Sequence, residues 1–373
     1  MKYICKSCGT SYEVKPEIIK CDCGAALWLD FKGKLNKQDI IKNEFSLWRY
    51  SKAYPIQIED VSVTYKEGLT PLANICYKGH SLLIKQDNLM PTGSFKDRGV
   101  TMVTNYLKKS GVTKFAEDSS GNGGSSYAGF SALGHIDSKI FVPAGTSEGK
   151  IGQMKVYGSE LVEISGSRSD VTTAAMQNIG DRIYVGHNWH PFFVQGVKSV
   201  GYEIWEQNNF KVPDNIVCVA GNGSMVVGIY MAFTELLDAR EIKSLPRIYA
   251  IQADSCNTLY RDFVGKTINF EVKPSIAEGI SIYRSTKHDY VLEAIRQSNG
   301  EILSVSEEEI KHSLFEVGRL GFYIEPTSAT GFAGLNRLIE NNSIQSDEQT
   351  AIIISGNGLK ATQKILDLMK EKK

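Results

Sequence analysis

The sequence has no surplus of charge of either sign and no long hydrophobic run. Its 373 residues include 42 lysines and arginines and 42 aspartates and glutamates. A balanced charge gives no electrostatic basis for binding nucleic acid or an anionic membrane. The segment Met1–Cys8 lacks the apolar stretch of a signal peptide, and no later segment approaches the ~20 apolar residues of a membrane span. We therefore expect a cytoplasmic protein that acts on a small molecule and binds neither nucleic acid nor a membrane.

Cysteine is scarce and unevenly placed, because four of the seven lie in the first 23 residues, as Cys5, Cys8, Cys21 and Cys23. An odd, clustered set argues against a disulfide framework and suggests a metal. The pairs C-x-x-C and C-x-C, each followed by glycine, resemble a zinc ribbon whose closed four-sulfur site would be structural. The tight C-x-C pair leaves a second interpretation open, in which the four cysteines are reduced and bind no metal.

From about Ser81 onward, short β-rich runs alternate with helical lengths. Strands separated by helices favour parallel sheets, and runs that are apolar on both faces favour sheets covered on both sides. The predicted fold class is α/β, with two doubly wound domains of mostly parallel sheets after an N-terminal zinc-ribbon-like appendage. The expected strands are S-L-L-I-K-Q, K-F-A-E-D, K-I-F-V-P-A, E-L-V-E-I-S, R-I-Y-V-G-H, N-I-V-C-V-A, R-I-Y-A-I-Q-A and T-A-I-I-I-S.

The stretch P-T-G-S-F-K-D-R-G, Pro91 to Gly99, places a lysine at the start of a predicted helix. Its proline and glycine indicate a turn, Ser94 is the expected N-cap, and the helix is expected to run to Lys109. Lys96 then lies in the first turn, where the positive end of the helix dipole disfavours an ammonium group and lowers the pKa. A neutral amine can attack an aldehyde. Taken alone, a surface lysine is the simpler interpretation.

A second motif, D-S-S-G-N-G-G from Asp118 to Gly124, follows a predicted strand and precedes a helix of small residues. Its hydroxyls, the Asn122 amide and the backbone N–H groups of a helix N-terminus suit a carboxylate and a neighbouring phenolic oxygen. A plain glycine turn is the alternative. The candidate substrate-binding residues are Ser119, Ser120, Gly121, Asn122 and Gly123.

A third motif, A-G-N-G-S-M-V-V-G from Ala220 to Gly228, again joins a strand to a helix through a glycine-rich turn. Backbone N–H groups at such a turn bind phosphate. The lysine and hydroxyl that end a P-loop are absent, so a monophosphate is expected rather than a triphosphate. The candidate phosphate-binding residues are Gly221, Asn222, Gly223, Ser224 and Met225.

A fourth motif, I-S-G-N-G-L-K, follows the last predicted strand and places Ser355 at its carboxyl end. Ligands of doubly wound sheets bind at these strand ends. An amine, a carboxylate loop, a monophosphate turn and a hydroxyl correspond to the functional groups of pyridoxal 5′-phosphate and an amino acid substrate.

These motifs, together with E-P-T-S-A at Glu325 to Ala329, resemble the threonine synthase family in sequence and in order along the chain. That family belongs to the fold-type-II pyridoxal-phosphate enzymes. The resemblance implies that Lys96 holds the cofactor covalently, with Phe95 packed beside it. It also implies that Asn122 bonds the ring hydroxyl and Ser355 the pyridine nitrogen. A neutral serine there favours elimination and replacement at the side chain over transamination.

One region departs from the family pattern. Threonine synthases typically carry N-P-x-R, which helps to bind the phosphate of phosphohomoserine, whereas here His190 stands for the asparagine and Phe193 for the arginine. Loss of a charge-assisted phosphate contact, worth ~1.5–3 kcal/mol, weakens the case for that substrate. Lys150, Lys155 and Lys198 are candidates to replace the charge, and each is equally compatible with a surface role.

The resemblance therefore implies a lyase of the threonine synthase type, converting O-phosphohomoserine and water to threonine and phosphate. A serine or threonine dehydratase and a β-replacement enzyme such as cysteate synthase remain alternatives, and a non-enzymatic binding protein on the same fold is a fourth. The family also suggests a homodimer with the cofactor in an interdomain cleft. The expected divisions are a ribbon at 1–30, a large cofactor-binding domain at 31–75 and 190–373, and a smaller mobile domain at 76–189.

Overall fold

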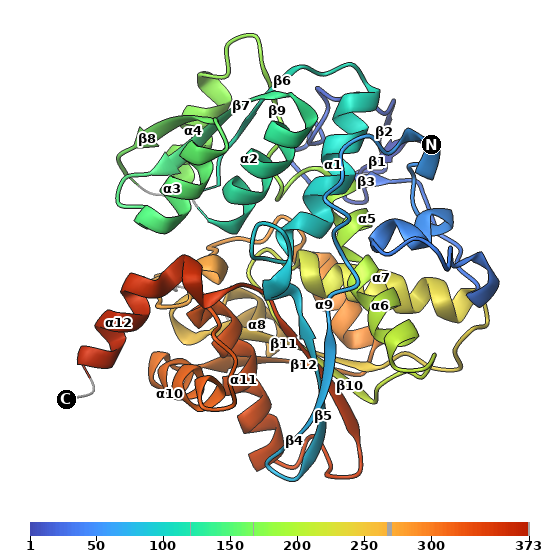
Figure 1. Cartoon of the computed structure of the whole chain (residues 1–373), viewed down its shortest axis with the longest axis vertical. Helices are drawn as coiled ribbons and strands as arrows, with labels where there is room; N and C mark the ends of the chain where they lie inside the picture. Colours follow the sequence, from blue (N-terminus) through green and yellow to red (C-terminus); the bar gives the residue numbers. More distant parts are fainter. Residues whose placement is uncertain (120, 167, 267–270, 372–373) are drawn as a thin grey trace. The chain divides into compact units, whose positions relative to one another are not determined.

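The computed structural model describes residues 1–119, 121–166, 168–266 and 271–371 (Figure 1). The chain forms two compact units, and each of them is discontinuous in sequence. Unit 1 comprises Met1–Gly68 and Ser94–Val197, and unit 2 comprises Leu69–Gly93 and Lys198–Lys373. The chain therefore passes from unit 2 to unit 1 between Gly93 and Ser94 of P-T-G-S-F-K-D-R-G, so the lysine of this motif belongs to unit 1.

Unit 1 contains a four-stranded parallel sheet with the strand order β8-β7-β6-β9. Its strands are β6 Lys114–Glu117, β7 Asp137–Pro143, β8 Glu160–Ile164 and β9 Ile183–Tyr184. The helices of this unit are α1 Lys96–Lys109, α2 Asn122–Gly134, α3 Glu148–Val156, α4 Arg168–Gln177 and α5 Pro191–Val197.

Strand β7 explains why helices cover both faces of this sheet. Ile140 and Val142 pack in one apolar cluster with residues of α2 and α3, whereas Phe141 packs in another cluster with residues of α4. Successive side chains of a strand point to opposite faces, so alternate residues of β7 reach opposite layers of helices. The sheet is therefore covered on both sides, as the apolar strand pattern predicts.

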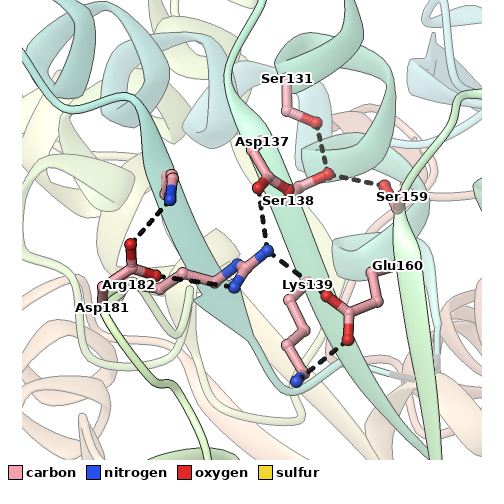
Figure 2. Close-up of polar contacts among 9 residues, drawn as sticks. Ser131, Asp137, Ser138, Lys139, Ser159, Glu160, Asp181 and Arg182 are labelled. Carbon is pink, nitrogen blue, oxygen red and sulfur yellow. Dashed lines mark hydrogen bonds and ion pairs between the residues drawn. The ribbon is translucent and has the colours of Figure 1, made fainter.

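Ion pairs join the amino-terminal ends of the four strands (Figure 2). Arg182 lies directly before β9, 2.8 Å from Asp137 of β7 and 3.3 Å from Glu160 of β8. Lys114 of β6 lies 2.7 Å from Asp181. These contacts lie at the opposite end of the strands from the glycine-rich turns, so they concern the stability of the sheet rather than ligand binding.

The N-terminal segment of unit 1 forms a small antiparallel sheet with the order β2-β1-β3. Its strands are β1 Tyr3–Ile4, β2 Ser11–Tyr12 and β3 Trp28–Leu29. The hydroxyl of Tyr3 donates to that of Tyr106 in α1 at 3.4 Å, which attaches this segment to the helix that begins at Lys96.

Unit 2 contains a six-stranded mixed sheet with the order β12-β11-β10-β13-β5-β4. Only the β4–β5 pair is antiparallel. The strands are β4 Leu72–Tyr77, β5 His80–Gln86, β10 Asn215–Val219, β11 Arg247–Ala253, β12 Glu301–Val305 and β13 Gln349–Ile354. The helices are α6 Ser199–Gln207, α7 Ser224–Asp238, α8 Thr258–Phe263, α9 His288–Gln297, α10 Glu307–Gly318, α11 Pro326–Glu340 and α12 Thr362–Lys370.

The core of unit 2 lies between the central strands and helix α11. Val217 and Val219 of β10 and Ile352 of β13 share an apolar cluster with Phe332 and Leu335 of α11. This packing fixes the carboxyl ends of β10 and β13, where two of the predicted binding turns begin.

Short 3-10 helices complete the described structure. They span Lys37–Asp39, Leu47–Ala53, Ile58–Asp60, Asp87–Leu89, Asp254–Cys256, Glu278–Ile280 and Gly358–Ala361. Within the described ranges, every helix is too short or too polar to cross a lipid bilayer.

The predicted α/β class is confirmed, and all eight expected strands exist, although R-I-Y-V-G-H contributes only the two residues of β9. Ser94 as an N-cap is wrong. Phe95 is the residue before the helix, and the buried Ser94 hydroxyl has no hydrogen-bond partner within the described residues. The expected domain limits stay a prediction, but β4 and β5 pair in unit 2, which differs from assigning residues 76–189 to the smaller domain.

Candidate active site

Lys96 is the first residue of α1, within the predicted first turn of the helix. Its Nζ lies 4.9 Å from the centre of the Phe95 ring and 5.4 Å from the centre of the Phe193 ring. Two aromatic rings therefore flank the amine. The helix ends at Lys109, as the sequence predicts, and is followed by Gly111 at φ +74°.

Helix α5 packs closely on the start of α1 through two glycines. A Cβ added to Gly99 would lie 2.4 Å from Cε2 of Phe193, and one added to Gly196 would lie 1.8 Å from the carbonyl oxygen of Arg98. Any larger residue would separate the two helices. These glycines therefore set the position of the Phe193 ring beside Lys96.

The predicted substrate loop lies between β6 and α2 in unit 1. The N–H of Ser119 donates to Oε2 of Glu117 at 2.6 Å, so this first donor of the loop is already engaged. The N–H of Gly121 donates to Oγ of Ser119 at 3.4 Å, and Asn122 is the first residue of α2. Ser120 lies outside the described residues. The N-terminus of α2, which begins at Asn122, adds backbone N–H groups of the kind that bind a carboxylate.

His187 is a residue of this loop region that the sequence reasoning missed. Its Nδ1 lies 2.6 Å from Oε1 of Glu117, although 70 residues separate the two in sequence. A Cβ added to Gly123 would lie 2.9 Å from Cε1 of His187 and 2.7 Å from Oγ of Ser119. The ring therefore packs directly on the glycine of the predicted substrate loop. A histidine following a strand was a weak signal, because nothing in the spacing indicated its partner.

The predicted phosphate turn in unit 2 joins β10 to α7. Gly223 precedes the helix at φ +81°, a conformation that favours glycine. A Cβ there would lie 2.1 Å from Cγ2 of Val291, and one at Gly221 would lie 2.9 Å from Cα of Ile280. Ser224 begins the helix, and its buried hydroxyl has no hydrogen-bond partner within the described residues.

The side-chain amide of Asn222 forms hydrogen bonds that hold this turn to Thr286. Its Oδ1 accepts from the N–H of Thr286 at 2.7 Å, and its Nδ2 donates to the Thr286 hydroxyl at 2.9 Å. Ser285 donates to the carbonyl of Asn222 at 3.0 Å. The sequence reasoning missed Ser285 and Thr286, which follow no glycine-rich motif.

Ser355 follows β13 and lies 3.0 Å from Oγ of Ser328. Ser328 belongs to E-P-T-S-A, and the N–H of Glu325 in the same motif donates to the carbonyl of Gly356 at 3.1 Å. Two motifs whose serines, Ser328 and Ser355, lie 27 positions apart in the sequence therefore meet in unit 2. E-P-T-S-A is therefore hydrogen-bonded to the segment that carries the Ser355 hydroxyl.

The candidate replacements for the missing arginine charge have different environments. Lys198 is buried, and its Nζ lies 2.9 Å from Oε1 of Glu235. Burial is the largest influence on the pKa of Lys198 and lowers it, whereas the nearby Glu235 carboxylate acts in the opposite direction. Lys155 is exposed and Lys150 is buried. A surface role is therefore wrong for Lys198, because Glu235 already binds its amine inside unit 2.

The four N-terminal cysteines lie together in unit 1. The sulfur atoms of Cys5, Cys8, Cys21 and Cys23 all lie within 4.8 Å of one another. Gly9 and Gly24 have φ of +78° and +85°, and their N–H groups each donate to the carbonyl of a cysteine at 2.8 Å. Hydrogen bonds with Thr10 are the main cause that lowers the pKa of Cys8 to about 6.

Comparison with known protein families accounts for these motifs. Residues 63–356 match the model of a family described as pyridoxal-phosphate dependent enzyme. The chain belongs to this family. The match spans the lysine, the predicted substrate loop, the phosphate turn and Ser355, so all four candidate elements lie within the family's own region.

Several curated relatives are named threonine synthase. The chain is 32% identical to the protein from Methanocaldococcus jannaschii, over 95% of this chain and 92% of that protein. It is 33% identical to the one from Methanosarcina acetivorans, over 98% of this chain and 94% of that protein. It is thus similar to threonine synthases over nearly its whole length.

Solved structures share the fold at lower identity. A fungal L-serine ammonia-lyase from Rhizomucor miehei has a TM-score of 0.71 at 20% identity, with 81% of this chain and 98% of that chain covered. The processed form of threonine deaminase isoform 2 from Solanum lycopersicum has a TM-score of 0.70 at 18% identity, with 96% and 95% covered. These likenesses establish the α/β fold of the family.

Proposed function

We propose that the chain is a pyridoxal-phosphate dependent lyase of the threonine synthase type, which converts O-phosphohomoserine and water to threonine and phosphate. Its identity of 32% and 33% with two threonine synthases over nearly the whole chain supports this activity. The structural observation that supports the proposal most directly is the position of Lys96. This lysine is the first residue of α1, and its amine lies between the rings of Phe95 and Phe193. The predicted substrate loop belongs to the same unit.

The residues present fit pyridoxal 5′-phosphate. In unit 2, the buried Ser224 hydroxyl, which has no hydrogen-bond partner among the residues that the structure describes, lies with the first N–H groups of α7, a donor set suited to a phosphate monoester. Ser355 offers a neutral hydroxyl suited to a pyridine nitrogen. In unit 1, Lys96 offers the amine, Phe95 an apolar face, and Asn122 an amide for the ring hydroxyl.

When bound, pyridoxal phosphate withdraws electrons from the substrate carbon next to the amino group. In the proposed reaction, the Lys96 amine holds the cofactor and later carries protons between substrate carbons. The N-terminus of α2 binds the substrate carboxylate, and Gly221 to Met225 bind the cofactor phosphate. Ser355 would offer the ring nitrogen a neutral hydroxyl, a partner that favours elimination and replacement chemistry over transamination.

A serine or threonine dehydratase is the second candidate, and Phe193 favours it. Its ring centre lies 5.4 Å from Nζ of Lys96, so an apolar ring occupies the position where the threonine synthase pattern has arginine. An apolar ring binds no phosphate, and Lys198 is engaged with Glu235. A substrate without a phosphate group would need no replacement for that charge.

Product analysis separates the two candidates. The purified holoenzyme is incubated in parallel with O-phosphohomoserine and with L-threonine. Inorganic phosphate together with threonine from the first supports the threonine synthase reaction. Ammonia and a 2-oxo acid from the second, with no phosphate from the first, would assign the chain to the dehydratases. Phosphoserine with sulfite tests β-replacement in the same assay.

We also propose that Cys5, Cys8, Cys21 and Cys23 bind a structural zinc ion. Four sulfur atoms within 4.8 Å of one another match the number and type of ligands of closed zinc sites. Metal analysis of protein purified without chelator tests this, and close to one zinc per chain is expected. Less than a tenth of an equivalent would favour reduced, metal-free cysteines.

A homodimer and a cytoplasmic location complete the proposal. The family resemblance is the basis for the dimer, and sedimentation of the holoenzyme tests it. A zinc-thiolate site favours a reducing compartment, in agreement with seven cysteines of which none forms a disulfide in the described structure.

A further inference from the structure

A buried carboxylate lies at the end of β6, directly before the predicted substrate loop. The side chain of Glu117 is fully buried, and both of its oxygens are engaged. Oε2 accepts the N–H of Ser119 at 2.6 Å, and Oε1 lies 2.6 Å from Nδ1 of His187. The backbone N–H of His187 also donates to Oε1, at 3.4 Å. One carboxylate therefore joins the first residue of the loop to a histidine from the segment after β9.

The His187 ring also contacts the other end of the predicted substrate loop. Its Cε1 and Nδ1 would lie 2.9 and 3.0 Å from a Cβ at Gly123, so the ring packs on that glycine. On another side, its centre lies 5.6 Å from the centre of the Phe193 ring. Phe193 in turn lies beside Lys96. The Glu117–His187 pair thus stands between the substrate loop and the aromatic ring next to the lysine, all within unit 1.

We propose that Glu117 is a positioning residue of the substrate loop, acting through Ser119 and through the His187 ring. The inference rests on the proposed function, in which this loop binds the carboxylate of an amino acid. By binding the Ser119 N–H and by orienting the His187 ring against Gly123, Glu117 positions two described residues of the loop, the second of which lies in the first turn of α2. The N-terminus of α2 is then held in place to donate to the substrate carboxylate.

The geometry requires an acid at this position. An ionised carboxylate only accepts hydrogen bonds, so Glu117 can accept from the Ser119 N–H and from Nδ1–H of His187 at once. Glutamine has one accepting oxygen and one donating nitrogen. In Glu117→Gln, the side-chain oxygen of glutamine can accept the hydrogen bond from the Ser119 N–H only if its NH2 group faces His187. That NH2 group would then donate to Nδ1 of His187, so the ring proton would have to lie on Nε2. Replacement by glutamine therefore reverses the tautomer of His187, and alanine removes both contacts.

Unit 1 offers a matched control in Glu67. This carboxylate is also buried, at 2% exposure, and also accepts from a backbone N–H, that of Tyr65 at 2.8 Å. It accepts as well from the ring Nε1–H of Trp48 at 3.1 Å. Its partners lie outside the substrate loop. Glu67→Gln therefore removes a buried carboxylate from the same unit but leaves the hydrogen bonds of Ser119 and His187 unchanged.

The first experiment measures binding to the holoenzyme. Cofactor content is read from its absorbance, and the dissociation constants of L-serine and of 2-aminoethanol, which lacks the carboxylate, are read from the change that each causes in the cofactor spectrum. In Glu117→Ala we expect full cofactor content, about tenfold or greater weakening of L-serine, and less than about twofold change for 2-aminoethanol. In Glu67→Gln, the ratio of the dissociation constant of L-serine to that of 2-aminoethanol should equal the wild-type ratio.

The second experiment reads the tautomer without any turnover or substrate. In protein labelled with 15N-histidine, with His187→Phe identifying the resonance, Nδ1 of His187 should carry a proton in the wild type and none in Glu117→Gln. An unprotonated Nδ1 in the wild type, or an unchanged one in the variant, would overturn the proposal even if Glu117→Ala failed to fold.

The binding result can also overturn it. Equal affinity of the wild type for L-serine and 2-aminoethanol, or an unchanged ratio in Glu117→Ala, would mean that Glu117 does not position a carboxylate site. Failure of the proposed function is distinct, because it would appear as wild-type protein that binds L-serine with this preference yet forms neither phosphate and threonine nor ammonia.

Discussion

The ring of Phe193 lies against the backbone of Gly99, with Cε2 only 2.4 Å from where a Cβ would be. Because Gly99 is three residues after Lys96 in the same helix, this contact holds an aromatic ring beside the amine. The S-F-K-D-R-G motif therefore supplies both the lysine and the glycine on which the neighbouring aromatic ring packs. Its last glycine admits the side chain that distinguishes this chain from the threonine synthase pattern.

Phe193→Arg tests what this ring does to substrate choice. An arginine at this position offers a charge-assisted phosphate contact that a phenylalanine ring cannot make, so the dissociation constant of O-phosphohomoserine should fall about tenfold or more relative to that of L-threonine. Phe193→Leu is the control, since it removes the ring without adding charge and should affect both substrates alike. If arginine raises both dissociation constants equally, position 193 does not contact the substrate phosphate.

The sequence could predict local elements but not their partners. Strand β10 and the turn into α7 were predicted because an apolar run followed by G-N-G is informative over a few residues. The contacts Glu117–His187 and Ser328–Ser355 join residues 70 and 27 positions apart, and nothing in spacing or composition indicates such pairs. Recognition of the motifs identified the loops, whereas packing determined which side chains brace them.

Two strands of unit 2 escaped prediction for a related reason. β4 and β12 lie at the two edges of the sheet, and their partly exposed sequences L-A-N-I-C-Y and E-I-L-S-V lack the continuous apolar run of buried parallel strands. β4 also pairs antiparallel with β5 across a turn in which Lys78 and Gly79 both have positive φ. A search for parallel strands between helices does not find such a hairpin.

Gly223→Ala tests the proposed phosphate turn. The residue has φ +81°, and its new Cβ would lie 2.1 Å from Val291, so the turn must shift and the first N–H groups of α7 move with it. We expect cofactor affinity to fall about tenfold or more, measured by titrating apoenzyme with pyridoxal phosphate. Gly145→Ala has the same sign of φ, +82°, but its Cβ would have no heavy atom of the described residues within 4 Å apart from its chain neighbours, and it should retain normal affinity.

Cys5→Ser tests the N-terminal site. A closed four-thiolate site tolerates the loss of a ligand poorly, so the variant should contain far less zinc and unfold at a lower temperature. Cys76→Ser, which changes an exposed cysteine of β4, should leave zinc content and Tm unchanged. Equal zinc content in Cys5→Ser and the wild type would remove Cys5 from the ligand set.

A buried and a surface ion pair should differ in their effect on stability. Lys85 and Glu203 are fully buried in unit 2 with 2.5 Å between Nζ and Oε2, so Glu203→Gln should lower the free energy of unfolding by about 3–5 kcal/mol. Arg182→Gln breaks contacts with carboxylates that are about half exposed, each worth about 0.2–1 kcal/mol. Urea denaturation followed by circular dichroism measures both, and a larger loss for Arg182→Gln would contradict this ranking.

The most direct test of the account is to locate the cofactor on the chain. The holoenzyme is reduced with borohydride, which fixes pyridoxal phosphate to the amine that binds it, and the digested peptides are analysed by mass spectrometry. The account predicts a single modified residue, Lys96, and no modification in Lys96→Ala. A label on any other lysine, or none at all in protein that contains the cofactor, would contradict it.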